Sequence, residues 1–169
     1  MKTAIFYGSS TGNTESAAKM IFKKLGGEEV LDIFDIASVK VEKMSEYEKL
    51  ILGTSTWGDG DLQDDWDSAF EKFKSIDFSK KTVAFFGLGD QEEYPDEFVG
   101  GIGTLYEVVN SQGAKVVGKW PVDGYYHDSS KAQDGDYFVG LALDDDNQSD
   151  MTDGRIESWC EQIRSEILG

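Results

Sequence analysis

Short apolar segments alternate along the chain with longer segments whose apolar residues recur at helical spacing. Runs such as residues 83–86 are continuously apolar, which indicates strands buried on both faces, as in a parallel sheet. The fifth strand segment occurs twice, at 115–117 running to Trp120 and again at 137–143. The predicted strands are 3–7, 30–34, 50–53, 82–86, 115–117 and 137–143.

Four amphipathic stretches predict helices between these strands. The first stops at Gly26 and the third near Gly113, because glycine readily ends a helix. The segment 35–47 has the weakest pattern and is predicted as a short helix with a loop. The apolar stripes cover 17–25, 66–73, 102–109 and 156–167.

Strands that alternate with helices predict a doubly wound α/β sheet, and residues 1–169 carry no linker or repeat, so one domain is expected. Ligands of such sheets lie beyond the carboxyl ends of the strands, near the switch in strand order. The polar residues 121–136 separate the two segments of the fifth strand. We interpret them as an insertion that interrupts this strand, with an ordinary surface excursion as the alternative.

The charge balance narrows the classes of partner. The 169 residues include 33 acidic and 16 basic ones, a formal net charge of −17. Such a surface repels phosphate backbones and anionic lipids, so we expect a basic protein partner rather than nucleic acid or membrane. No apolar run approaches the roughly 20 residues of a membrane span, and the first residues resemble a strand more than a signal peptide. A cytoplasmic monomer is the expectation, since no large apolar surface stripe is left unassigned.

The chain has one cysteine and one histidine, which limits metal and thiol chemistry. Cys160 shares a helical stripe with Trp159 and Ile163, so it is predicted to pack in the core. It has no partner for a disulfide within the chain. His127 stands in a polar stretch and is predicted to be a solvated loop residue. No catalytic residue and no metal site are expected.

The first predicted strand leads directly into a polar loop and then a helix. Five hydroxyl or amide side chains surround Gly12, with no lysine or arginine among them. A helix N-terminus with such donors suits a phosphate group. Neither a P-loop nor a Gly-x-Gly-x-x-Gly fingerprint is present, which favours one terminal monophosphate. The alternative is a capped helix without a ligand. The five residues are Ser9, Ser10, Thr11, Asn13 and Thr14.

Two further loops at predicted strand ends each carry an aromatic residue. Trp57 lies in the acidic, glycine-rich segment 54–61, and Tyr94 lies in 87–95. Both loops leave the edge of the sheet where a ligand is expected, so the two rings could enclose a planar group. Each aromatic residue could instead cover a helix.

In this order, Ser-Ser-Thr-Gly-Asn-Thr, Ser-Thr-Trp-Gly-Asp-Gly and Gly-Leu-Gly-Asp-Gln-x-x-Tyr-Pro-Asp resemble the flavodoxin family. Residues 138–148 resemble its long-chain branch, and the resemblance covers essentially the whole chain. It implies a five-stranded parallel sheet of order 2-1-3-4-5 with helices on both faces. It also implies non-covalent FMN and the function of a low-potential one-electron carrier, not an enzyme.

The resemblance further implies roles for single residues. Trp57 and Tyr94 would flank the isoalloxazine ring, and Ser55 and Thr56 would contact the cofactor from the same loop as Trp57. The pyrimidine side of the ring would meet Leu88, Gly89 and Asp90. The FMN phosphate would be bound by Ser9, Ser10, Thr11, Gly12, Asn13 and Thr14.

Two of the implied roles depart from the family pattern or leave a choice. The peptide at Gly58 would turn its carbonyl toward flavin N5, and the family often has a bulkier residue there. Glycine turns with little steric penalty, so an easily reached neutral semiquinone is expected. Asp146 would lie near the ribityl chain, although the run 144–146 allows a shift by one residue.

Acidic residues dominate the loops that would surround the flavin. No lysine or arginine occurs between Leu50 and Glu71, where five acids lie, or between Thr82 and Ala114, where six lie. Each nearby charge disfavours an anionic reduced flavin by about 1 kcal/mol, so the second electron should enter at a low potential. The same acids would steer the protein onto basic partners, although solubility alone could explain them. The resemblance suggests ferredoxin- or flavodoxin-NADP reductase, pyruvate oxidoreductase and nitrogenase reductase as partners.

Three other functions fit the same fold class. An FMN-dependent NAD(P)H:quinone reductase would need cations for a second nucleotide, and the loops offer none. A signalling receiver domain would need acids at the end of the first strand, where Gly8, Ser9 and Ser10 stand. A flavin-free interaction module is disfavoured by Trp57 and Tyr94.

Overall fold

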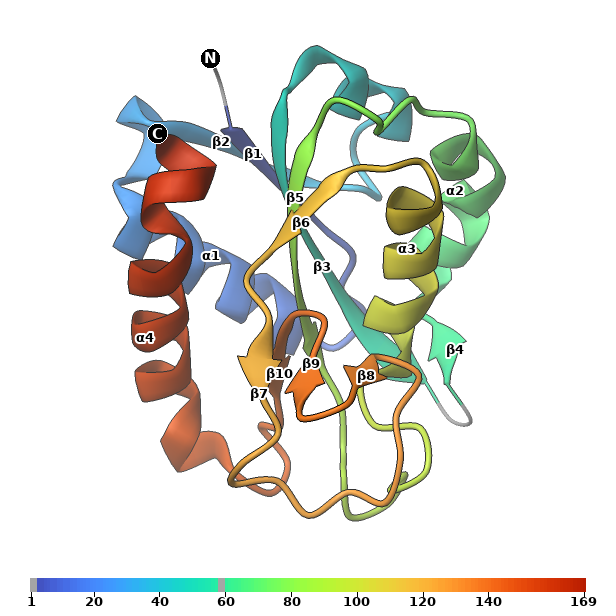
Figure 1. The fold of residues 1–169 in the computed structure, drawn as a ribbon, viewed down its shortest axis with the longest axis vertical. Helices are drawn as coiled ribbons and strands as arrows, with labels where there is room; N and C mark the ends of the chain where they lie inside the picture. Colours follow the sequence, from blue (N-terminus) through green and yellow to red (C-terminus); the bar gives the residue numbers. More distant parts are fainter. Residues whose placement is uncertain (1–2, 58–59) are drawn as a thin grey trace.

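The computed structural model describes residues 3–57 and 60–169, which form a parallel sheet with helices on both faces (Figure 1). All pairings between its main strands are parallel. The order β2-β1-β3-β5, with β6 and β10 sharing the last place, confirms the predicted order 2-1-3-4-5. The strands are β1 (Thr3–Tyr7), β2 (Leu31–Asp35), β3 (Lys49–Trp57), β5 (Thr82–Leu88), β6 (Lys115–Val117) and β10 (Leu141–Leu143).

The helices divide between the two faces of the sheet (Figure 1). On one face α1 (Asn13–Leu25) and α4 (Ser149–Leu168) pack against inward residues such as Ile5. On the other face α2 (Asp64–Lys74) and α3 (Gly100–Ser111) pack against residues that include Phe6. Neighbouring residues of one strand thus enter opposite cores, which explains the continuous apolar runs in the sequence.

Two short 3₁₀ helices complete the connections. One is η1 (Gly27–Glu29), and the other is η2 (Val41–Glu46), which confirms a short helix within 35–47. The third strand was predicted as 50–53 but continues to Trp57. It continues because its end pairs with β5 on one side and with β4 (Asp61–Leu62) in an antiparallel hairpin.

The fifth strand position is divided, as predicted. Both β6 and β10 pair in parallel with β5, β6 along its first half and β10 along its second half. The insertion between them contains three short antiparallel strands, ordered β7-β9-β8, toward the carboxyl ends of the main strands (Figure 1). They are β7 (Trp120–Pro121), β8 (Gln133–Asp134) and β9 (Tyr137–Phe138).

The prediction of 137–143 as one strand is therefore wrong. Residues 137–138 belong to the small sheet, and the chain turns before β10 begins. The turn includes Gly140, where an added Cβ would lie 2.4 Å from the carbonyl oxygen of Phe85. Residues 137–143 form one β-rich and largely apolar run, so the sequence pattern alone could not assign its two ends to different sheets.

The structure also tests the predictions for Cys160 and His127, neither of which was expected to take part in chemistry. Cys160 is buried in the α4 core, which confirms the packing prediction, and burial raises the pKa of its thiol to about 11. His127 lies in a loop as predicted, but it is half-buried rather than fully solvated. Its ring packs 5.4 Å from that of Phe98 and 5.0 Å from that of Phe138, and its Nε2 lies 2.7 Å from Gln133 Oε1.

Candidate functional site

A cavity of about 310 Å³ opens at the carboxyl edge of the sheet, where loops that follow β1, β3, β5 and β10 meet. This is the edge that the doubly wound fold predicts for a ligand, beside the reversal of strand order at β1 and β3. Among the described residues it is lined by Thr11, Asn13, Thr14, Ser55, Thr56, Leu88, Gly89, Asp90, Glu93, Tyr94, Asp145 and Asp146.

One end of the cavity is the start of α1. The helix begins after Gly12, whose φ of +95° favours glycine because other residues are strained there. No side chain of the described part of the chain caps this helix, so its first N–H groups can bind an anion. Thr11, Asn13 and Thr14 add neutral donors to the cavity wall. This end has the chemistry of a site for a phosphate group.

Three of the residues predicted for the phosphate lie beside the cavity rather than on its wall. Ser9 Oγ accepts a hydrogen bond from Gly12 N at 3.1 Å, which holds the turn before α1. Ser10 Oγ accepts one from Gln63 Nε2 at 3.0 Å. Gly12 shapes the backbone of the loop.

The other end of the cavity carries Tyr94, which is 37% exposed. Leu88 and Gly89 leave β5 next to Ser55 and Thr56 of β3, so four predicted residues lie on neighbouring strand ends. An aromatic side chain beside a polar cavity is available to stack on a planar group. The predicted roles of the Trp57 side chain and of Gly58 lie outside the described residues.

Asp90 is held as a carboxylate by hydrogen bonds from its own loop and from Asn147. Its Oδ1 accepts hydrogen bonds from Glu92 N at 3.1 Å, Glu93 N at 3.0 Å and Asn147 Nδ2 at 2.8 Å. Burial opposes ionisation, but the hydrogen bonds from Glu93, Asn147 and Glu92 outweigh it and lower the pKa of Asp90.

The three acids of the run 144–146 differ in position. Asp144 is fully buried and accepts hydrogen bonds from Gln91 N and Asn147, while Asp145 and Asp146 face the cavity. Desolvation, together with the charges of Asp90, Asp144 and other nearby acids, raises the pKa of Asp146. Asp146, which was predicted to lie near the ligand, is thus on the cavity wall, and Asp144 is not.

The lining is acidic and neutral. Asp90, Glu93, Asp145 and Asp146 contribute carboxylates, and none of the described lining residues is basic. A ligand that adds negative charge in this part of the cavity is therefore disfavoured. The described residues also contain no cluster of histidine, cysteine or acidic side chains that could hold a metal ion.

Several residues of the site were missed from the sequence. Glu93 lines the cavity, and its position beside predicted residues was the available signal; Asp145, which the run 144–146 left open as an alternative to Asp146, lines it too. Gln91 is 1% exposed, and it donates from Nε2 to Gln148 Oε1 at 2.9 Å and accepts from Tyr126 N at 2.7 Å. It ties the loop after β5 to the insertion. No sequence pattern marks such a buried polar link.

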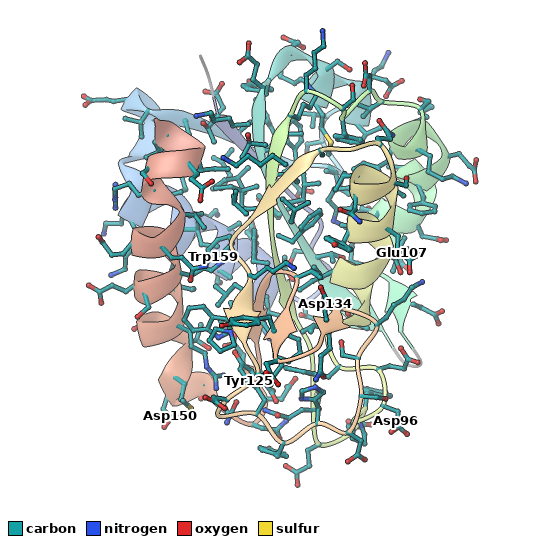
Figure 2. All side chains as sticks on the ribbon, in the orientation of Figure 1. Asp96, Glu107, Tyr125, Asp134, Asp150 and Trp159 are labelled. Carbon is teal, nitrogen blue, oxygen red and sulfur yellow. The ribbon has the colours of Figure 1, made fainter. Side chains whose placement is uncertain are left out.

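Arg155 of α4 completes this link. Its Nη1 donates to Gln148 Oε1 at 2.9 Å, and its guanidinium lies 4.1 Å from the centre of the Tyr125 ring. Figure 2 shows Tyr125 at the same end of the molecule as Asp96 and Asp150. The insertion is thus attached to two loops that line the cavity through buried polar groups.

Comparisons with known proteins agree with this geometry. The model of the family described as flavodoxin matches residues 5–159. The chain is 47% identical to Flavodoxin 1 of Escherichia coli K12, over 98% of this chain and 94% of that protein. It is 44% identical to a flavodoxin of Picosynechococcus sp., over 96% of each chain. A crystal structure of Fusobacterium nucleatum flavodoxin bound to flavin mononucleotide superposes with a TM-score of 0.92, at 34% identity and 98% coverage of both chains.

Proposed function

This chain belongs to the flavodoxin family, and we propose that it binds one FMN non-covalently and carries single electrons between redox proteins. It is an electron-transfer protein and not an enzyme. The observation that carries the cofactor proposal is the cavity itself, which joins an uncapped helix N-terminus to an aromatic side chain. These are the two features that a phosphate and a planar ring of one ligand require.

The phosphate end fits the cofactor by charge. The start of α1 supplies backbone N–H groups and the positive end of the helix dipole. Hydroxyl and amide donors of the same loop supply the remaining hydrogen bonds without any cation. The residues proposed to bind the phosphate are Ser9, Ser10, Thr11, Gly12, Asn13 and Thr14.

The ring end fits the cofactor by shape. We propose that Tyr94 and Trp57 stack on the two faces of the ring and that Gly58 turns its carbonyl to N5. Bound FMN supplies the redox chemistry, and the protein orients it and limits its contact with water. The other residues proposed to contact the cofactor are Ser55, Thr56, Leu88, Gly89, Asp90 and Asp146.

The acids of the lining support a low potential for the second electron. Asp90 keeps its charge because its hydrogen bonds lower its pKa, and Glu93, Asp145 and Asp146 lie on the same wall. An added negative charge beside them is disfavoured by about 1 kcal/mol for each close carboxylate in a wet site. The reduced protein is therefore a strong reductant under this proposal.

The partners of the chain are redox proteins. We propose that those that dock at the acidic edge carry basic patches, since opposite charge speeds encounter. Ferredoxin- or flavodoxin-NADP reductase, pyruvate oxidoreductase and nitrogenase reductase remain the candidates. We further propose that residues 1–169 act as one domain and as a monomer in the cytoplasm. Among the described residues, no helix is long and apolar enough to cross a membrane.

Flavin binding tests the proposal directly. FMN fluorescence should be quenched as apoprotein is added, with an end point at one flavin per chain, because stacking on an aromatic side chain quenches the ring. Riboflavin should bind more weakly, since it lacks the phosphate that the start of α1 is proposed to hold. Fluorescence that stays constant at micromolar protein would contradict the proposal.

A further inference from the structure

A fully buried glutamine joins the phosphate end of the cavity to α2. Gln63 is 0% exposed and precedes the first residue of α2. Its Oε1 accepts hydrogen bonds from Asp65 N at 3.1 Å and Trp66 N at 3.3 Å. Its Nε2 donates to Asp65 Oδ2 at 2.8 Å and to Ser10 Oγ at 3.0 Å. All four hydrogen-bonding positions of this buried amide are thus used.

The orientation of the amide is fixed by the backbone. Two backbone N–H groups, of Asp65 and Trp66, face one end of the Gln63 side chain, and an N–H group can only donate. The oxygen must therefore lie at that end, and the NH₂ group must face Ser10. A turn of the amide by 180° would oppose donors to donors on one side.

The fixed amide decides what the Ser10 hydroxyl can do. An amide N–H only donates, so Ser10 Oγ is the acceptor in this pair. The hydroxyl hydrogen then points to another acceptor. Ser10 is exposed and stands between Ser9 and the cavity residue Thr11, next to the start of α1. An anion bound at that helix end is the acceptor that fits this hydrogen.

The surroundings of Gln63 are closely packed. A Cβ added at Gly8 would lie 2.3 Å from Gln63 Oε1 and 2.7 Å from Trp66 Cδ1. Trp66 Nε1 donates to the carbonyl oxygen of Gly53 at 2.8 Å, and the same oxygen accepts from Gly8 N at 3.1 Å. The end of β1, the middle of β3 and the start of α2 are therefore held together around this side chain.

We propose that Gln63 is a positioning residue that presents the Ser10 hydroxyl as a donor to the phosphate of the flavin, and so favours FMN over riboflavin. The inference rests on the proposed function, because it assigns the phosphate to the start of α1. It adds a residue outside the cavity wall, which acts only through Ser10.

The test compares two ligands that differ only by the phosphate. Dissociation constants for FMN and riboflavin are measured by fluorescence quenching for the wild type, Gln63→Met, Gln63→Glu with Asp65→Asn, Ser10→Ala, and each Gln63 change combined with Ser10→Ala. Gln63→Met is neutral and removes all four hydrogen bonds. Gln63→Glu keeps acceptors for Asp65 N and Trp66 N but would set an oxygen against Asp65 Oδ2, so it is made together with Asp65→Asn, which supplies a donor there and leaves the net charge unchanged. Its carboxylate would accept the Ser10 hydrogen and withdraw it from the phosphate.

The matched control is Gln112, which joins two segments in the same way far from the cavity. Its Oε1 accepts from Phe78 N at 2.7 Å, and its Nε2 donates to the carbonyl oxygen of Ile76 at 3.0 Å. Gln112→Met should lower the stability of the protein without changing the ratio of the two dissociation constants.

Each change at Gln63 should weaken FMN binding by about fivefold or more, the effect of one lost hydrogen bond, and change riboflavin binding by less than about twofold. In the Ser10→Ala background the same changes should leave the ratio of the FMN and riboflavin dissociation constants within about twofold of its value for Ser10→Ala alone. Equal losses for both flavins would show a merely structural role and overturn the inference. A full effect that persists without the Ser10 hydroxyl would overturn it too. A wild-type protein that binds neither flavin would overturn the proposed function itself, and the inference with it.

Discussion

The buried carboxylate of Asp144 accepts a hydrogen bond from the backbone N–H of Gln91 at 3.2 Å, and so joins the loop after β10 to the loop after β5. Asn147 donates to Asp144 and also to Asp90 Oδ1, at 2.8 Å for the latter. One buried group therefore positions both of the loops that bring carboxylates to the cavity.

We expect Asp144→Asn to destabilise the protein by about 1–3 kcal/mol, because an amide NH₂ would replace one of the acceptors that Gln91 and Asn147 use. Urea unfolding of the apoprotein measures the change. Asp128→Asn, which removes an exposed carboxylate in the insertion, is the control. If the two variants have the same stability, Asp144 does not hold these loops.

Stacking at the ring end predicts a loss of FMN affinity of about 1–3 kcal/mol for Tyr94→Ala, and a similar loss for Trp57→Ala. Calorimetric titration of each apoprotein with FMN gives the two values. Tyr137→Ala removes a tyrosine of similar exposure, 48%, on the small sheet. This control should bind FMN like the wild type, and unchanged affinity in both test variants would refute stacking on either face.

The pKa shifts of two acids predict opposite effects of pH on stability. The pKa of Asp90 is lowered in the folded protein, so Asp90 stabilises the fold above its usual pKa near 3.9, and this contribution is lost as pH falls through the lowered value. Asp90→Asn should therefore be less stable than the wild type at neutral pH, with a difference that shrinks in acid.

Asp146 has a raised pKa, so its contribution is present at low pH and is lost as pH rises through the raised value. Asp146→Asn should be more stable than the wild type at neutral pH and equal to it in strong acid. Unfolding free energies measured across the acid range check both signs. The same sign for both variants would contradict the assigned electrostatics.

The link from α4 to the insertion predicts a local effect. Arg155→Ala would remove the hydrogen bond to Gln148 and the contact with the Tyr125 ring, and should cost about 1–3 kcal/mol of stability. Relative to the wild type, hydrogen exchange should also accelerate in 122–136 more than it does in β3. The control is Arg164→Ala, whose side chain on the same helix bonds to carbonyl oxygens of Lys24 and Leu25. Equal acceleration in both variants would mean that Arg155 does not secure the insertion in particular.

Much of the fold was predictable because its signals are local. Apolar runs such as 83–86 mark strands buried on both faces, and Gly26 ends α1 where the helical stripe ends. The cavity followed from loops at strand ends, since parallel strands bring those loops to one edge. The interrupted fifth strand was visible as two apolar segments with polar residues between them.

The remaining features depend on contacts between distant residues. Residues 137–138 pair with the insertion and not with β5, and the chain passes close to the backbone of Phe85 at Gly140 before β10 begins. Gln63 contacts Ser10 across 53 positions, and Gln91 contacts Gln148 across 57. A polar residue that is buried because its hydrogen bonds are made within the protein has the same sequence signature as an exposed one.

An anaerobic reductive titration of the FMN-loaded protein, followed by its visible spectrum, tests the central claim most directly. The account predicts two separate one-electron steps, with a blue neutral intermediate that accumulates before the second electron enters at a lower potential. A yellow protein that bleaches in a single two-electron step, above all with NAD(P)H alone, would contradict a one-electron carrier.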